Sequence, residues 1–416
     1  MKIAIVGAGV SGLVAAHVLH ARHDVTLFEA NDYAGGHTHT VRVETDGGAW
    51  DVDTGFIVHN DRNYPEFQRL LARLGVATQP SEMSFGVSDP VGDFEYTGAS
   101  PNGLYAKRSH LVTPWFQRMV ADLVRFNREA RTLLADGRDG HGPSLRAWLE
   151  ARRYSRAFVE RLIVPQAAAV WSADPRQLWS FPARFLVEFF DNHGMLGLRD
   201  RPRWRTIMGG SRRYVEAIAG PLGARLRLAT PIRAIARHAD HVELAPVRGE
   251  PERFDHVVIA THGDQALRML ADPSEREHEL LGAFPYQSND VTLHTDRGLL
   301  PRRRRAWASW NYHLLEREIG RPTVTYHMNR LQSLDADREL LVTLNRDADV
   351  RSEHVLGRFR YDHPVFTAAG VAAQRRRHEL DAVARTSYCG AYWGWGFHED
   401  GVVSALRACE ALGGTL

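Results

Sequence analysis

The sequence is poor in several residue types from which common sites are built. It has two cysteines among its 416 residues, Cys389 and Cys409, which is too few for a disulfide framework or a thiolate metal cage. We interpret both as small buried hydrophobic residues. Only Lys2 and Lys107 are lysines, whereas the other 50 of the 52 basic residues are arginines. A mechanism that requires a lysine therefore has two candidates.

Long apolar runs are missing as well. No stretch of about 18 uncharged apolar residues occurs, so no membrane-spanning helix is predicted. The first residues lack the basic region and cleavage site of a signal peptide, and we expect a cytoplasmic protein. The net charge of +2 does not indicate a nucleic-acid partner. Among the 21 histidines, no pair at helical ligand spacing is joined by a third ligand, so we predict no metal site.

The N-terminal segment predicts a strand, a tight turn, a helix and a second strand. Residues 2–6 are a short apolar run typical of a buried parallel strand. The turn Gly7-Ala8-Gly9-Val10-Ser11-Gly12 follows, then the helix-forming run 13–19 and a second strand at 25–28. This is one βαβ-type unit within about thirty residues.

The spacing of the glycines indicates a dinucleotide site. Gly7 permits the tight turn, Gly9 lets the backbone approach a pyrophosphate, and Gly12 lets the helix and strand pack closely. The N-terminus of the helix then presents free N–H groups to the phosphates. Glu29, at the end of the second strand, is expected to accept hydrogen bonds from the adenosine ribose.

The remainder of the chain divides into a helical and a strand-rich part. From about residue 60 to 205 the pattern is helical, with apolar faces in these segments: Tyr64–Leu74, Trp115–Leu134, Leu145–Ala151 and Ser155–Leu162. Strands are predicted near 225–228, 241–244 and 256–260, and period-two segments suited to an antiparallel sheet at 290–294, 306–312, 323–328 and 340–344. A short strand at 387–390 precedes a last helix, Val402–Leu412.

Three segments resemble one family. Gly35-Gly36-His37-Thr38 and Asp53-Thr54-Gly55-Phe56 follow Glu29, Pro231–Ile235 precedes Phe254–Thr261, and Gly390–Val403 lies near the C-terminus. Together they resemble the flavin-containing amine oxidase superfamily, which includes monoamine oxidases, protoporphyrinogen oxidase and carotenoid desaturases. The resemblance implies FAD as the cofactor.

It also implies individual roles. The paired glycines Gly35 and Gly36 would wrap the diphosphate and the flavin edge, whereas His37 stands in place of the usual arginine and weakens the charge contact with phosphate. One acid of Glu399 and Asp400 would bond the ribityl chain or flavin rim. The residues implied to bind FAD are Gly7, Gly9, Val10, Ser11, Gly12, Glu29, Ala30, Gly35, Gly36, His37, Thr38, Thr54, Gly55, Phe56, Ile232, Thr261, Gly390, Glu399, Asp400, Gly401 and Val402.

We therefore predict an α/β fold. A Rossmann-like FAD-binding domain of the two-dinucleotide-binding type should carry an inserted α+β substrate domain with a helical part and an antiparallel sheet. We expect residues 1–80, 205–275 and 375–416 in the FAD-binding domain. Residues 81–204 and 276–374 are expected in the substrate-binding domain.

Four further segments resemble one bacterial branch of predicted NAD/FAD-binding proteins. They are Gly209–Val215, Ala308–His313, Met328–Gln332 and Gly396–Gly401. Genes of this branch are often found beside cyclopropane-fatty-acyl-phospholipid synthases. The resemblance implies a fatty acyl chain as the substrate class, by association.

The expected reaction is hydride transfer from a substrate carbon to flavin N5. Many amine oxidases of the superfamily use a lysine near N5, but neither Lys2 nor Lys107 matches such a position. His398 is our candidate for the catalytic residue, because its motif should place it beside the flavin and its ordinary pKa suits proton transfer. A purely structural hydrogen-bonding role for His398 stays open.

Several alternatives stay open. The favoured function is desaturation or oxidation of a lipid acyl chain; the alternatives are oxidation of a small amine, and a non-catalytic FAD-binding partner of a lipid-modifying enzyme. Tyr392–Trp395 forms either the wall of an apolar pocket or part of the core. Arg302–Arg305 is interpreted as a solvated basic loop, with contact to anionic phospholipid at the inner membrane face as the alternative.

Overall fold

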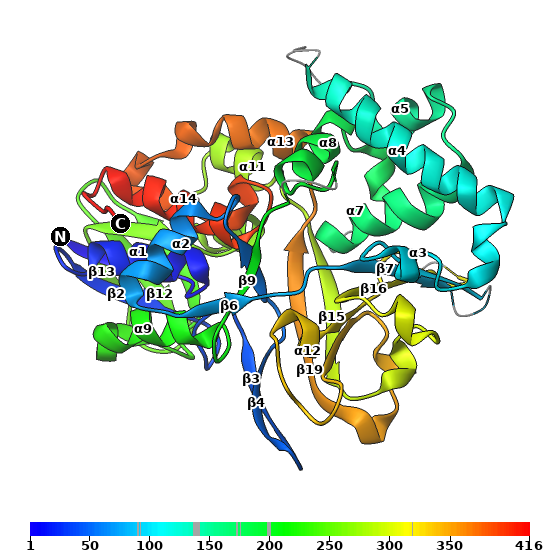
Figure 1. Ribbon diagram of the computed structural model, residues 1–416. Coiled ribbons are helices and arrows are strands. Elements are labelled where there is room, and N and C mark those ends of the chain that lie inside the picture. Colours follow the sequence, from blue (N-terminus) through cyan, green and yellow to red (C-terminus); the bar gives the residue numbers. More distant parts are fainter. Residues whose placement is uncertain are drawn as a thin grey trace.

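The computed structural model describes residues 1–89, 91, 93–135, 142–171, 174, 176–197, 201–317 and 319–416. A parallel sheet with its helices forms one side of the molecule, and a larger sheet with a helical layer forms the other (Figure 1). Both chain termini lie on the side of the parallel sheet.

The parallel sheet has five strands in the order β10-β2-β1-β14-β20. Its strands are β1 (Lys2–Val6), β2 (Asp24–Phe28), β10 (Leu226–Arg227), β14 (His256–Ile259) and β20 (Thr386–Tyr388). All neighbouring pairs are parallel, and the apolar runs that predicted strands at 2–6, 25–28 and 256–260 are buried on both faces, as a covered parallel sheet requires.

Different layers cover the two faces of this sheet. One core lies between the sheet and four helices: α1 (Val10–Leu19), α2 (Pro65–Leu74), α9 (Arg212–Leu222) and α14 (His398–Glu410). The other core lies beneath a three-stranded antiparallel sheet and several helices: β11 (Ile232–Arg237), β12 (Val242–Pro246), β13 (Glu252–Phe254), α10 (Gly263–Met269), α11 (Glu275–Leu281) and α13 (Ala368–Arg375). This is the Rossmann-like architecture predicted from the sequence.

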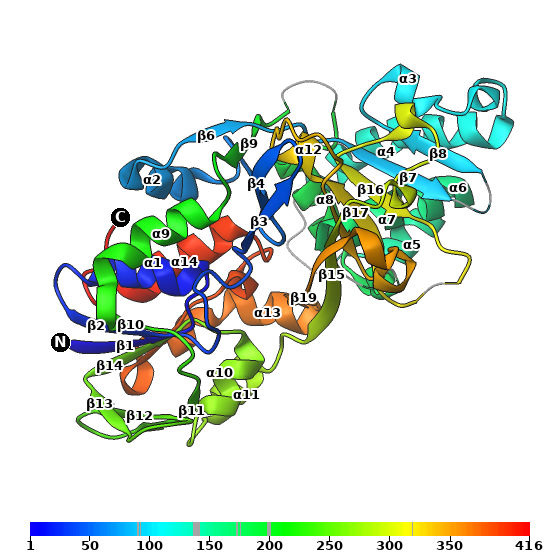
Figure 2. The same cartoon turned by 90° about the horizontal axis from the view of Figure 1, so that it is seen from below.

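The second sheet has seven strands in the order β19-β15-β18-β17-β16-β7-β8. They are β7 (Phe85–Asp89), β8 (Phe94–Thr97), β15 (Tyr286–His294), β16 (Trp310–His313), β17 (Val324–His327), β18 (Leu341–Leu344) and β19 (Val355–Pro364). All pairs are antiparallel except β16 with β7. The long strands β15 and β19 lie between the parallel sheet and the rest of this sheet in both views (Figure 1 and Figure 2).

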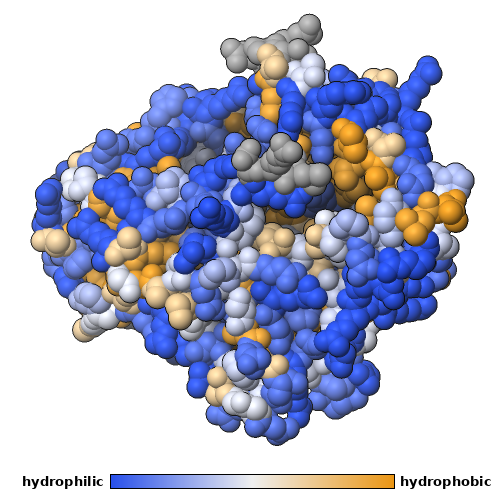
Figure 3. Space-filling view, in the orientation of Figure 1, coloured by the Kyte–Doolittle hydropathy of each residue, from blue (hydrophilic) through white to orange (hydrophobic). Residues whose placement is uncertain are grey.

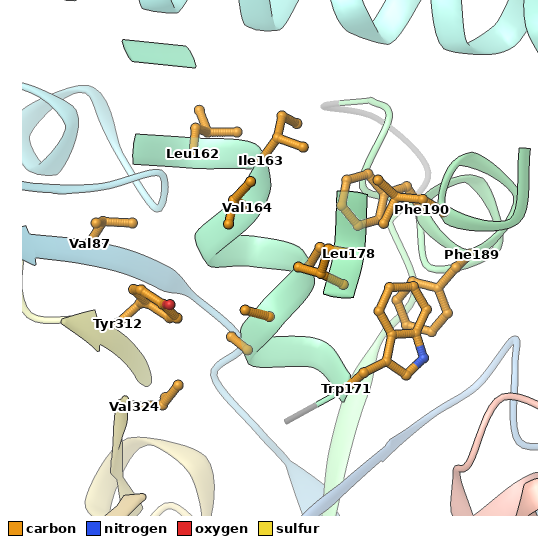
Figure 4. Packing of buried hydrophobic residues seen from close by; sticks show 14 of the residues in the cluster. Val87, Leu162, Ile163, Val164, Trp171, Leu178, Phe189, Phe190, Tyr312 and Val324 are labelled. Carbon is orange, nitrogen blue, oxygen red and sulfur yellow. The ribbon is translucent and has the colours of Figure 1, made fainter. Parts of the chain in front are cut away.

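A helical layer packs on the seven-stranded sheet. It comprises α3 (Pro101–Leu104), α4 (Pro114–Ala135), α5 (Leu145–Ala151), α6 (Arg156–Phe158), a π-helical turn (Val159–Ile163), α7 (Val164–Trp171) and α8 (Ala183–Asn192). In Figure 4, Val87, Tyr312 and Val324 of the sheet lie next to the part of α7 that carries Val164. Sheet and helices thus share one large core, and the predicted helices at 64–74, 115–134 and 145–151 are confirmed.

The prediction that residues 60–205 are helical throughout is wrong. This region also contains β6 (Thr78–Pro80), β7 and β8, and β7 joins the large sheet beside β16. Further elements not predicted are β3 (Thr40–Thr45), β4 (Gly48–Asp53), β5 (Val58–Asn60), β9 (Trp204–Ile207) and α12 (Met328–Leu331). Strands of three to six residues carry too little periodicity to be separated from loops, and neighbours distant in the sequence stabilise them.

Both cysteines lie in the core of the molecule. Cys389 and Cys409 are free and buried, which confirms the prediction that they are small buried residues. Among the described residues, no helix is both long and apolar enough to cross a bilayer, and no group of three or more His, Cys, Asp or Glu side chains is arranged to hold a metal ion.

Candidate functional site

One continuous cavity of about 1290 Å³ extends from the N-terminal glycine turn to helix α4. Ordinary small-molecule pockets occupy roughly 300–1,000 Å³. The cavity is thus large enough for a cofactor together with a substrate. Figure 3 shows a hollow on the face seen in Figure 1, with hydrophobic residues gathered beside it.

The glycine turn has the backbone geometry expected of a phosphate-binding loop. Gly7 has a φ of +98°, and a Cβ on Gly12 would lie 1.8 Å from the Gly7 carbonyl oxygen. A Cβ on Gly9 would meet nothing within 4 Å, and Gly9 lines the cavity. No side chain caps the N-terminus of α1, so its N–H groups are available to an anion.

Glu29 is buried at the far end of this loop. Its Oε2 accepts a hydrogen bond from the Ala8 N–H at 2.7 Å, and its Oε1 accepts one from the Asn31 N–H at 2.9 Å. Each carboxylate oxygen keeps a lone pair, and Glu29 lines the cavity. The carboxylate can therefore accept ribose hydroxyls without giving up its backbone contacts. Ile232, on β11, and Thr261 line the same end of the cavity.

The second glycine pair lies directly against the first turn. Gly35 N–H donates to the Ala8 carbonyl at 2.8 Å, and a Cβ on Gly36 would lie 3.2 Å from the Gly9 Cα. Side chains larger than hydrogen would therefore separate the two loops. The cavity wall at this point is formed by backbone, which suits an elongated diphosphate.

His37 lies within a group of buried histidines at the cavity wall. Its ring centroid is 5.2 Å from that of His363 and 6.0 Å from that of His262. Burial, with the neighbouring His363 and His262, lowers the pKa of His37 well below its ordinary value. Its Nε2 is buried and has no hydrogen-bond partner among the described residues. A neutral imidazole thus stands where the family arginine was expected.

His398 begins α14 and also lines the cavity. Its ring stacks on Phe56 with centroids 3.5 Å apart. Its Nε2 lies 2.9 Å from the Thr38 hydroxyl and 3.1 Å from the Tyr214 hydroxyl. Burial, with a contribution from His59, lowers the pKa of His398 to about 3. The ring is neutral and held by two hydroxyl groups, and its part in proton transfer stays a prediction.

The acids after His398 serve as helix caps. Glu399 accepts hydrogen bonds from the N–H groups of Glu66 and Phe67 at 3.0 and 2.9 Å, which caps α2. Asp400 accepts one from the Phe397 N–H at 2.9 Å, and burial raises its pKa to about 7. Neither acid lines the cavity.

Most of the residues predicted to bind the cofactor are brought together. Those that line the cavity are Gly7, Gly9, Val10, Ser11, Glu29, Ala30, Gly35, Gly36, His37, Thr54, Gly55, Phe56, Ile232, Thr261 and Gly390. Those that do not are Gly12, Thr38, Glu399, Asp400, Gly401 and Val402. Gly401 instead accepts a hydrogen bond from the Ser11 hydroxyl at 3.0 Å, which ties α14 to α1.

The other end of the cavity is apolar and was not predicted residue by residue. Its walls come from the seven-stranded sheet, from α4, α7 and α8, and from the C-terminal loop. Residues from these elements that line it are Phe85, Met119, Val120, Leu123, Leu162, Ala169, Val170, Trp171, Phe189, Trp310, Tyr326, Leu344, Phe366 and Trp395. Tyr392 and Trp393 are buried core residues, and Tyr392 and Trp395 line the cavity, so the aromatic run serves both purposes.

These residues fit FAD. Gly9 leaves open space above the loop, Glu29 has free lone pairs for ribose hydroxyls, and the two glycine pairs meet through backbone alone. A Rossmann-like sheet whose glycine turn borders a large cavity defines the class of dinucleotide-binding proteins.

Comparison with known proteins gives the family. The model of the family described as flavin containing amine oxidoreductase matches residues 10–322, and the chain belongs to this family. AofH of Mycobacterium tuberculosis, a protein named as a flavin-containing monoamine oxidase, is 25% identical over 283 residues, or 66% of this chain and 59% of AofH. An L-amino-acid oxidase of Siganus canaliculatus is 26% identical over 313 residues, or 70% of this chain and 56% of its own. The chain thus spans less than two thirds of these relatives.

Solved structures share the fold at low sequence identity. A cyclohexylamine oxidase from Brevibacterium oxydans has a TM-score of 0.70 at 18% identity, with 99% of each chain covered. A protein described as a CLA-producing fatty acid isomerase from P. acnes has a TM-score of 0.67 at 16% identity, with 98% of each chain covered. The chain thus shares the fold of these two proteins.

Proposed function

We propose that this protein oxidises or desaturates the acyl chain of a lipid. FAD, when bound, supplies a hydride acceptor at flavin N5. The observation that carries the proposal is the apolar end of the cavity, which is lined by residues such as Met119, Leu123 and Leu162. These side chains offer a substrate apolar surface and no charged group. Burial of methylenes against such walls contributes about 0.8 kcal/mol for each CH₂.

A small amine would suit this cavity less well. None of the described residues that line the cavity is a lysine. Lys2 lies over the Phe254 ring, and Lys107 pairs with Asp93 at 2.8 Å. The fold similarity to a fatty acid isomerase, and the resemblance to the branch encoded beside cyclopropane-fatty-acyl-phospholipid synthases, support an acyl substrate. The names of the relatives AofH and L-amino-acid oxidase support oxidation of an amine as the alternative.

The proposal assigns roles to the residues of this chain. The predicted cofactor residues that line the cavity would hold FAD, while Gly12, Thr38 and residues 399–402 support its walls from behind. His398 would either transfer a proton or, held in place by its hydrogen bonds to Thr38 and Tyr214, fix the position of Phe56. We also propose the predicted division into a cofactor part (1–80, 205–275, 375–416) and a substrate part (81–204, 276–374); the strands of the two large sheets fall on opposite sides of it.

The apolar walls also protect the reaction. Aromatic residues from three elements, Trp171, Phe189 and Trp395, surround the region between cofactor and tail. They exclude water from the carbon that loses hydride and hold the chain in an extended form, which reduces the entropy lost in reaching the reactive geometry. In this arrangement the protein contributes orientation and exclusion of water rather than a charged catalyst.

Anaerobic mixing of the yellow holoenzyme with candidate substrates tests the proposal. We expect fatty acids or phospholipids with unsaturated or methyl-branched chains to bleach the flavin absorbance, whereas cyclohexylamine and putrescine leave it unchanged. Bleaching by an amine and by no lipid would establish the amine oxidase alternative. If neither class bleaches the flavin while dithionite does, the protein is a non-catalytic FAD-binding partner of another enzyme.

A further inference from the structure

The cavity reaches one face of α4, from which Val120, Leu123 and Asn127 line it. From the chain after α8, it is lined by Gly194, Met195, Gly197 and Arg201, and Arg201 is exposed to solvent. We call this solvent-exposed part of the cavity, between two elements of the helical layer, its mouth.

A second hollow continues the mouth along the outside of α4. It has a volume of about 530 Å³ and is lined by Val124, Asn127, Arg128, Arg131, Thr132 and Ala135. Asn127 belongs to both hollows. The spacing of Val120, Val124, Asn127 and Arg131 places them on one stripe of the helix, so this stripe changes from apolar inside the cavity to cationic outside it.

Among the described residues, the arginines at the mouth have no carboxylate partner. Arg131 donates to the Leu196 carbonyl at 3.0 Å, and Arg201 donates to the Gly197 carbonyl at 3.1 Å. Arg128 is exposed, and none of these three arginines forms an ion pair with a carboxylate within the described part of the chain.

The opposite face of the same helix is different. There Arg118 and Arg125 both pair with the buried Asp122, at 3.3 and 3.1 Å, and Arg125 also approaches Glu129. On this face an acid lies beside each arginine, whereas the described residues place none beside the arginines of the mouth.

We propose that this mouth binds the anionic headgroup of the acyl substrate, a carboxylate or a phosphate, while the tail enters the apolar cavity. This inference rests on the proposed function. The planar guanidinium groups of Arg128, Arg131 and Arg201 offer paired N–H donors that match such oxygens. The reverse orientation would move a charge into an apolar region without a counter-ion, which is strongly unfavourable. The substrate therefore enters tail first, and the reacting carbon lies far from the headgroup.

Binding measurements on the holoenzyme test this proposal without turnover. The perturbation of the flavin absorbance spectrum is titrated with oleate and with oleyl alcohol, which has the same tail and no charge. Binding to vesicles of phosphatidylglycerol and of phosphatidylcholine is measured in parallel by co-sedimentation. The variants are Arg128→Gln, Arg131→Gln and Arg201→Gln, and Arg118→Gln on the opposite face of α4 is the matched control.

We expect each mouth variant to weaken binding of the anionic ligand by about 5-fold, as for an exposed ion pair. Oleyl alcohol should bind all variants equally, and Arg118→Gln should match the unmodified protein. A loss confined to oleate identifies a free acid as the ligand, and a loss confined to phosphatidylglycerol vesicles identifies a lipid headgroup. Equal effects on oleate and oleyl alcohol, or no effect of any mouth variant, would overturn the proposal.

The two proposals fail in different ways. If oleate bleaches the flavin but its affinity does not depend on the mouth arginines, the headgroup site is wrong and the acyl oxidation stands. If anionic ligands bind through the arginines but no acyl compound bleaches the flavin, the binding site stands and the proposed reaction is wrong.

Discussion

Two glycines of the same turn, Gly9 and Gly12, should respond in opposite ways to replacement by alanine. At Gly12 the added Cβ would lie 1.8 Å from the Gly7 carbonyl oxygen, so the start of α1 must move away from β1. Such overpacking costs roughly 1–3 kcal/mol or more. Gly9 has φ −70° and ψ −178°, which alanine adopts without strain, and its Cβ meets nothing within 4 Å. Gly9→Ala should therefore keep or slightly raise stability, by about 0.4–1 kcal/mol.

The cofactor affinity should reverse this order of severity. The methyl group at position 9 would project into the space that the diphosphate is proposed to occupy. We expect at least a 10-fold weaker FAD affinity, about 1.4 kcal/mol, for a variant that folds normally. Urea unfolding of the apoprotein gives the stability, and quenching of FAD fluorescence gives the affinity. An unchanged FAD affinity in Gly9→Ala, or an unchanged unfolding free energy in Gly12→Ala, would refute the assigned geometry.

Three further variants probe other parts of the cavity. Glu29→Gln replaces a carboxylate that accepts hydrogen bonds from the N–H groups of Ala8 and Asn31. FAD should bind about 10- to 150-fold more weakly, because a hydrogen bond to a charged group contributes about 1.5–3 kcal/mol. An FAD dissociation constant within 2-fold of that of the unmodified protein would contradict this. Leu123→Trp fills the apolar end of the cavity, so oleate should bind at least about 10-fold more weakly while FAD affinity stays constant. Equal loss of both affinities would show that oleate and FAD do not bind at opposite ends of the cavity. Burial lowers the pKa of His59 to about 4. Below pH about 6.5 this histidine is therefore protonated in the unfolded chain but stays neutral in the folded chain. The protein loses stability as the pH falls from about 6.5 to about 4. His59→Phe should remove this loss and be relatively more stable at pH 5 than at pH 7 by about 2 kcal/mol, measured by urea unfolding at both values; the same pH dependence in both proteins would exclude protonation of His59 as the cause.

The cofactor end was predictable from the sequence because it is built from local motifs. The buried apolar strands and the spaced glycines lie together within about thirty residues, and the acid Glu29 comes directly after the second strand. The backbone forms most of this wall, so the residues that matter are glycines, which a sequence reveals. The expected contacts of Glu399 and Asp400 came from the resemblance alone, and the geometry uses both acids to cap helices.

The substrate end was less predictable because its strands are paired through distant contacts. β19 has the alternation Arg358-Phe359-Arg360-Tyr361, typical of a half-buried strand, and was nevertheless not predicted. β7 is buried between β16 and β8, which lie on opposite sides of the helical layer in the sequence. Whether an acid faces Arg128 and Arg131 depends on what surrounds them in space. Sequence spacing alone gives the stripe on α4 but does not show that none of the described acids pairs with it.

Amino-acid substitutions affect ligand recognition differently at the two ends of the cavity. A wall of glycine backbone and helix N-termini recognises a diphosphate through groups that every residue possesses, so it persists while sequences diverge. A wall of side chains such as Met119, Leu123 and Trp171 recognises its ligand by shape and polarity, and each exchange alters the ligand. This explains how chains with 16–18% identity retain TM-scores of 0.67–0.70 with this protein while bearing names that range from amine oxidases to a fatty acid isomerase. The substrate must therefore be inferred from the α4 end of the cavity, where an apolar wall ends in arginines that have no acid beside them among the described residues.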